Sequence, residues 1–162
     1  MNAKESPSNI TTRREFCAQA CYAASFAAAG VLVTACNSGN PTSPSGGSAP
    51  SLPSVSGTVA GRVVSVSVNS SSPLAAVGSA ALVQTSLGSF LLARVAQDNF
   101  SALTATCTHE AQTVTGFADG HYVCNVHGSE FSTSGAVVMG PANRALQSYA
   151  TSFAGDVVSF SV

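Results

Sequence analysis

Tryptophan is absent from this chain of 162 residues, and lysine occurs only once, as Lys4. Charged residues make up 8% of the sequence and the formal net charge is −1. The chain therefore lacks the basic surface that nucleic-acid-binding proteins use. It also lacks any internal repeat and any long stripe of apolar residues at helical spacing, which disfavours a helical protein. The length suggests one domain, or two at most.

Charges are missing altogether between Glu15 and Arg62. The first part of this gap is apolar and rich in alanine, and the second part is rich in serine, proline and glycine. Composition alone thus divides the chain into three parts.

An arginine pair stands directly before the apolar part, in the string Thr12-Arg13-Arg14-Glu15-Phe16. The 20 residues from Phe16 to Ala35 are uncharged. This pattern resembles a twin-arginine export signal, T-R-R-x-F, whose route generally exports folded proteins, often with a cofactor already inserted. The alternative is an ordinary secretory signal in which the two arginines form the basic region.

The apolar run ends in Val33-Thr34-Ala35-Cys36, which resembles a bacterial lipobox. We expect residues 1–35 to be a signal peptide and Cys36 to be the lipidated residue, so that a lipid anchor holds the protein to a membrane on the periplasmic or other extracytoplasmic side. The alternative is an uncleaved transmembrane helix, because about 20 apolar residues can span a bilayer. The weakly apolar alanines and Gln19 favour cleavage. Residues 36–56 are then a Ser/Pro/Gly-rich tether.

Residues 57–162 form the predicted folded part. Val64, Val66 and Val68 alternate with polar residues, and Val158 and Phe160 do the same near the end of the chain. This period of two predicts strands, so the expected fold class is all-β, a small antiparallel β sandwich or barrel. Asp119-Gly120 is expected to form a hairpin turn. Further predicted strands are Phe90–Val95, Phe100–Thr106, His121–Cys124, Ala136–Val138 and Leu146–Ser152.

Five cysteines occur in the chain, of which Cys17 and Cys21 fall in the predicted signal peptide. Cys107 and Cys124 are the two in the predicted folded part, and each has a histidine close by. The pattern is C-x-H, then 14 residues, then C-x-x-H, which ends at His127. Such a set suits three chemistries: a disulfide with two bystander histidines, a structural zinc ion, or a [2Fe–2S] cluster with two cysteines on one iron and two histidines on the other.

The residues around these four side chains resemble the Rieske iron–sulfur family. The matching strings are Cys107-Thr108-His109, then Cys124-x-x-His127-Gly128-Ser129-x-Phe131, then Gly135-x-Val137-x-x-Gly140-Pro141-Ala142. The resemblance implies a β fold with a cluster-binding subdomain of two loops. It implies one [2Fe–2S] cluster whose metal ligands are Cys107, His109, Cys124 and His127.

The same resemblance assigns roles to four neighbouring residues. Ser129 matches the serine that donates a hydrogen bond to a bridging sulfide, and Gly140 and Pro141 match the loop that shields the cluster from water. Phe131 stands where the cytochrome bc branch has a tyrosine whose hydroxyl donates to a cysteine sulfur. That branch also has a disulfide between the loops, whose positions here are Gln112 and Val126. The missing donor predicts a reduction potential in the lower or middle part of the Rieske range, which runs from roughly −150 to +300 mV.

The leading functional interpretation is an exported, membrane-tethered protein that transfers one electron between a redox protein donor and a redox protein acceptor. Rieske oxygenases add a catalytic iron domain, and the 35 residues after His127 contain no histidine, so this chain alone is not expected to be an oxygenase. Alternatives are the small Rieske subunit of a larger exported oxidoreductase, either arsenite-oxidase-like or a quinol-oxidising bc-type complex, and a zinc-stabilised surface binding module. His121 is expected to be a spare surface histidine.

Overall fold

The computed structural model describes residues 48–162, which consist of strands, turns and loops. The predicted signal peptide, Cys36 and most of the predicted tether lie outside the described residues. Within residues 48–162, there is no helix with the length and apolar character needed to cross a membrane.

Thirteen strands in this part of the chain form three sheets. The middle sheet has the order β1 (Ser54–Ser56), β4 (Ala80–Thr85), β5 (Gly88–Ala96), β6 (Asn99–Thr104) and β11 (Ser148–Tyr149). The outer sheet has the order β12 (Thr151–Ala154), β13 (Val157–Ser161), β3 (Val63–Ser67) and β2 (Thr58–Ala60). The third sheet, called the site sheet below, has the order β10 (Val137–Met139), β9 (Ser129–Ser132), β8 (His121–Cys124) and β7 (Gly116–Ala118).

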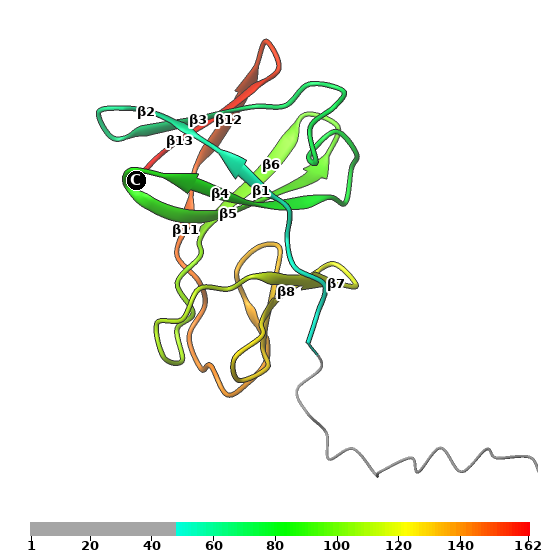
Figure 1. Ribbon diagram of the computed structural model, residues 1–162, viewed down its shortest axis with the longest axis vertical. Helices are drawn as coiled ribbons and strands as arrows, with labels where there is room; N and C mark the ends of the chain where they lie inside the picture. Colours follow the sequence, from blue (N-terminus) through cyan, green and yellow to red (C-terminus); the bar gives the residue numbers. More distant parts are fainter. Residues whose placement is uncertain (1–47) are drawn as a thin grey trace, which may run out of the picture. The chain divides into compact units, whose positions relative to one another are not determined.

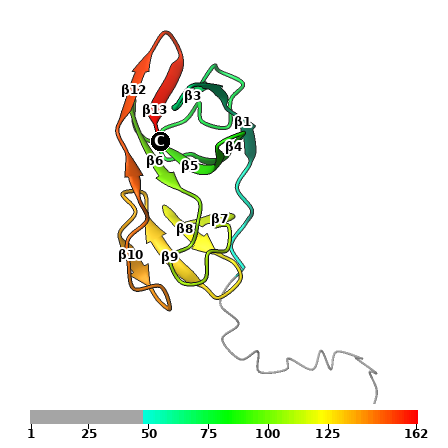
Figure 2. The same ribbon diagram turned by 90° about the vertical axis from the view of Figure 1, so that its left-hand side faces the viewer.

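The middle sheet is covered on both faces, as Figure 1 shows. Along β4, Ala81 and Val83 belong to the apolar core against the outer sheet, whereas Ala80 and Leu82 belong to the core against the site sheet. Successive side chains of a strand point to opposite faces, so each strand of the middle sheet supplies both cores. The result is a β sandwich with a third sheet packed on its other side (Figure 2).

The all-β prediction is confirmed, and its alternating pattern holds where one face is solvated. Val64 and Val66 in β3 are buried at 0% and 2% exposure, while Ser65 between them is half-buried. The predicted strand His121–Cys124 coincides with β8. Asp119 and Gly120 join β7 to β8 with φ values of 51° and 77°, the left-handed conformation that a tight hairpin turn requires.

Two details of the predicted strands were wrong. The segment Leu146–Ser152 forms two strands, because β11 pairs with β6 in the middle sheet and β12 pairs with β13 in the outer sheet. A chain that passes from one sheet to the next at a corner must break its pairing. The sheets are also not wholly antiparallel, since β1 runs parallel to β4.

The folded part begins earlier than the predicted boundary at Gly57. Leu52 is buried at 8% exposure between the middle sheet and the site sheet. Its backbone N–H donates to the carbonyl of Thr115, and the carbonyl of Pro50 accepts from Phe117. The segment 49–56, called the strap below, thus lies along β7 and then continues as β1 beside β4. Its Ser/Pro-rich composition resembles a linker, but its backbone groups find partners at two sheet edges.

Candidate metal centre

Two loops at one end of the site sheet carry the four predicted ligands. The first loop connects β6 to β7 and holds Cys107 and His109, and its turn is closed by a hydrogen bond from the N–H of Ala111 to the carbonyl of Cys107 (2.9 Å). The second loop starts at Cys124, the last residue of β8, and leads through His127 into β9. The N–H of Gly128 closes it on the carbonyl of Cys124 at 2.8 Å.

The two thiols lie together in the core. Cys107 and Cys124 are exposed by only 2% and 1%, and both are free rather than joined in a disulfide. Burial is the main cause that raises the pKa of the Cys124 thiol, and the hydrogen bond with Cys107 adds to it. The backbone N–H groups of Val126 and His127 point at the Cys124 sulfur and act in the opposite direction, favouring the thiolate. Such donors suit a sulfur that binds a metal as the anion.

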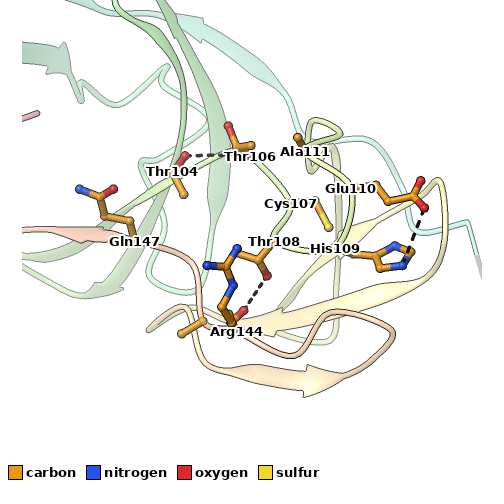
Figure 3. Close-up of a pocket in the computed structure, with 10 residues that line it drawn as sticks. Thr104, Thr106, Cys107, Thr108, His109, Glu110, Ala111, Arg144 and Gln147 are labelled. Atoms are coloured by element: carbon orange, nitrogen blue, oxygen red, sulfur yellow. Dashed lines mark hydrogen bonds and ion pairs between the residues drawn. The ribbon is translucent and has the colours of Figure 1, made fainter.

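The two imidazoles lie together at the surface. The rings of His109 and His127 are 5.0 Å apart between centroids and perpendicular, with 29% and 40% of their side chains exposed. Glu110 lies beside both: its carboxylate oxygens are 3.6 Å from His127 Nδ1 and 4.0 Å from His109 Nε2. Figure 3 draws the contact with His109. Sequence reasoning missed Glu110, although its place directly after His109 was the signal that could have found it.

The donor atoms form two pairs rather than one compact set. Among residues 48–162, the ligand atoms that all lie within 4.8 Å of one another belong to His109, Glu110 and His127, and neither cysteine belongs to that group. A single tetrahedral zinc ion would hold all four donors about 2.0–2.3 Å from its centre. Every pair of donor atoms would then lie closer together than 4.8 Å. A buried sulfur pair and an exposed nitrogen pair therefore fit a two-iron cluster better than one ion.

A third loop fastens both ligand loops. Gly140 and Pro141 are exposed at its start, and the N–H of the buried Ala142 donates to Ser129 Oγ at 3.0 Å. Further along, the carbonyl of Arg144 accepts a hydrogen bond from Thr108 Oγ1 at 2.6 Å, drawn in Figure 3. The loop therefore bonds to the residue between Cys107 and His109 as well as to the serine after the second ligand pair.

The remaining predicted residues around the site differ in their burial. Ser129 is fully buried, and because its Oγ accepts from Ala142, its O–H is free to donate. Phe131 is also fully buried and brings no polar group. His121 lies half-buried on β8 and belongs to no cluster of ligand atoms within the described residues.

A groove of about 560 Å³ runs between the first loop and the segment from Arg144 to Gln147, with Cys107 and His109 on its wall (Figure 3).

Tyr122 is a residue that sequence reasoning did not single out. It lies on β8 two residues before Cys124 and is completely buried. Its hydroxyl is the one buried side-chain polar atom in residues 48–162 without a hydrogen-bond partner. Burial also raises the pKa of this hydroxyl, so it stays protonated and is a donor. No pattern in the sequence distinguishes it from an ordinary core tyrosine.

Comparison with known families identifies one match. The profile of the Rieske [2Fe-2S] domain matches residues 64–150, which is more than half of the chain and includes all four predicted ligands. A search of curated proteins finds no match.

Several solved structures contain chains similar to this one, and three of them are described below. The cyanobacterial plasma membrane Rieske protein PetC3 from Synechocystis PCC 6803 is 33% identical, with a TM-score of 0.47 over 51% of this chain and 86% of that one. The ferredoxin of carbazole 1,9a-dioxygenase from Nocardioides aromaticivorans IC177 is 16% identical, with a TM-score of 0.47 over 60% and 96%. A complex of reduced oxygenase and oxidized ferredoxin in carbazole 1,9a-dioxygenase contains a chain that is 18% identical, with a TM-score of 0.49 over 60% and 92%.

Proposed function

This chain belongs to the Rieske [2Fe-2S] domain family, and we propose from that premise that it carries single electrons between redox proteins outside the cytoplasm while tethered to a membrane. It is a Rieske-type electron-transfer protein with one [2Fe-2S] cluster. We assign Cys107 and Cys124 to the inner iron, and His109 and His127 to the outer iron. When bound, the cluster supplies a one-electron couple between roughly −150 and +300 mV.

The observation that carries this assignment is the division of the donors by burial. The sulfurs of Cys107 and Cys124 lie in the core, where little water competes for them. The imidazole edges of His109 and His127 face solvent, where a partner protein can approach them. A buried end and an exposed end give the electron a short path to one face of the protein.

The surrounding residues have supporting roles in this proposal. Ser129 has an O–H that would donate to a sulfur of the bound cluster, and the loop from Gly140 to Arg144 holds both ligand loops and would limit the access of water. Glu110 places a carboxylate beside both imidazoles. A negative charge there favours a docking partner whose surface is basic around its own redox centre.

The test of this function is the composition and spectrum of the full-length protein purified without oxygen. We expect about two irons and two acid-labile sulfides per chain, a red-brown colour, and a low-temperature EPR signal of low average g after reduction. Potentiometric titration should follow a one-electron curve. A colourless protein with stoichiometric zinc, bound by His109, Glu110 and His127 or by the cysteines, would contradict the proposal.

Export and anchoring rest on the first part of the sequence. The arginine pair at Arg13 and Arg14 and the lipobox ending at Cys36 support a twin-arginine signal over residues 1–35 and lipidation of Cys36. The route suits a cluster inserted before export. The change Cys36→Ser should move the protein from the membrane fraction to the soluble fraction, and Cys21→Ser should not. Unchanged membrane association of the Cys36→Ser variant would instead support an uncleaved helix.

A second form of this function is that of a small Rieske subunit in a larger exported oxidoreductase. The groove of about 560 Å³ beside Cys107 and His109 offers a surface for such a partner. Affinity purification of the lipoprotein from its native membrane separates the two forms. A stoichiometric large partner would favour the subunit, and recovery of the chain alone would favour a free carrier.

A further inference from the structure

The hydroxyl of Tyr122 is buried without a partner in a core that is otherwise apolar. Hydroxyl groups are rarely buried unpaired in native proteins, because they lose their hydrogen bonds to water and gain none in return. Thirteen other buried hydrophobic residues share this core with Tyr122, and two of them, Cys107 and Cys124, carry sulfur atoms that can accept a hydrogen bond. A partner for the hydroxyl is therefore to be sought at the sulfur end of the site.

The strand register places Tyr122 beside the metal centre. Side chains two residues apart on a strand share a face, so Tyr122 lies on the same face of β8 as Cys124. Across the strand pair, Tyr122 is opposite Phe131 and Cys124 is opposite Ser129. Directly opposite residues have Cβ atoms about 4.5–5.5 Å apart. Tyr122 thus neighbours the position where the bc branch of the family has its sulfur-directed tyrosine hydroxyl.

We propose that the Tyr122 hydroxyl donates a hydrogen bond to a sulfur of the bound cluster, replacing from β8 the donor that Phe131 cannot supply from β9. This inference rests on the proposed function, since it requires the cluster. A hydrogen bond to sulfur is stronger when the cluster carries the added electron, because the sulfur is then more negative. Tyr122 accordingly stabilises the reduced state and raises the reduction potential, as a tuning residue that transfers no electron itself.

The experiment compares Tyr122→Phe with Tyr149→Phe in the full, cluster-loaded chain. Tyr149 is half-buried in β11 and packs on Phe90 in the other core, away from the cysteines. At a fixed electrode potential, Tyr122→Phe should lower the ratio of reduced to oxidised protein about tenfold. Film voltammetry should therefore show a reduction potential lower by about 59 mV, the value of a tenfold ratio for one electron. Tyr149→Phe should leave it unchanged. An unchanged potential in a loaded Tyr122→Phe variant would mean that the hydroxyl binds a water or a carbonyl, and would overturn the inference.

A swap of the two side chains keeps the test decisive if Tyr122→Phe does not retain its cluster. The double variant Tyr122→Phe/Phe131→Tyr returns one hydroxyl to the same pair of strands. Loading and a potential near that of the wild type would support the inference. A loaded swap variant with a ratio about tenfold higher than that of the wild type would overturn it, because the new hydroxyl would then add a donor rather than replace one. Iron and sulfide analysis of the wild type is separate: their absence would contradict the proposed function rather than this inference.

Discussion

The cysteine and histidine side chains at this site differ in how far they are buried. The two loops bury the cysteine sulfurs and leave the imidazoles in contact with water. Cys124 is 1% exposed, whereas the side chain of His127 is 40% exposed. The spacing C-x-H and C-x-x-H predicts four ligands, and in the structure the two sulfurs lie together and the two imidazoles lie together. It could not predict Tyr122, since a hydroxyl becomes significant only when its burial and its missing partner are known.

Histidine 127 is expected to be essential for the cluster, and His121 is its matched control. His127→Gln removes one imidazole from the outer iron, so the purified protein should lose nearly all of its EPR signal and most of its iron. His121→Gln should retain both, because His121 lies on β8 outside the group of ligand atoms. Equal loss in the two variants would contradict the ligand assignment.

The reduction potential should fall in the lower or middle part of the range from roughly −150 to +300 mV. Phe131 provides no hydroxyl, and Gln112 and Val126 cannot form a disulfide between the loops. The missing disulfide leaves the reduced cluster less stabilised even where the Tyr122 hydroxyl replaces the donor that Phe131 lacks. A redox titration read by EPR measures the midpoint, and a value at the top of the range would refute this expectation.

Local sequence patterns predict some strands and turns of this fold but not others. The strand β4 contains four consecutive buried residues, Ala80–Val83, because both faces of the middle sheet are covered. A strand buried on both faces has no alternation of apolar and polar residues, so the period of two that identified β3 and β13 could not identify it. The β7–β8 turn was predictable because Asp-Gly favours positive φ whatever packs around it.

Gly135, in the turn between β9 and β10, should be more sensitive to substitution than Gly120. Both have positive φ, at 89° and 77°, but a Cβ on Gly135 would lie 3.0 Å from the carbonyl oxygen of Leu146 and 3.1 Å from Leu103, whereas Gly120 has open space. Gly120→Ala should cost about 1–2 kcal/mol from backbone strain alone. Gly135→Ala should cost about 2–4 kcal/mol because crowding adds to strain. Thermal unfolding of the loaded proteins by circular dichroism measures both, and equal losses would contradict this account.

At the scale of the whole described part, the strap joins the middle sheet to the site. Asn125, directly after Cys124, accepts from the N–H of Ala49 at 2.9 Å and donates to its carbonyl at 3.2 Å. A few residues later, the carbonyl of Pro53 accepts from Leu82 in β4 at 2.9 Å. The residues that precede the predicted domain boundary therefore support the second ligand loop.

The burial of Leu52 predicts that the strap contributes to stability. Leu52→Ala should lower the free energy of unfolding by about 2–4 kcal/mol, because it leaves a cavity between two sheets. Leu87→Ala is the same substitution at a turn residue that is 45% exposed. It should change the free energy of unfolding by less than about 0.5 kcal/mol. Thermal unfolding of the Leu52→Ala and Leu87→Ala variants measures both changes. A stable Leu52→Ala variant would mean that the strap is only a linker.

The sequence by itself determined the all-β class and the hairpin at Asp119-Gly120, and it predicted four ligand residues, because each of these depends on neighbours a few positions away. Periodicity, turn chemistry and ligand spacing are local properties. Only the tertiary structure decided that the middle sheet is covered on both faces, that the strap belongs to the fold, and that Glu110 and Tyr122 lie at the site. Those features depend on which surfaces meet, and burial and hydrogen-bond partners exist only once distant segments have packed together.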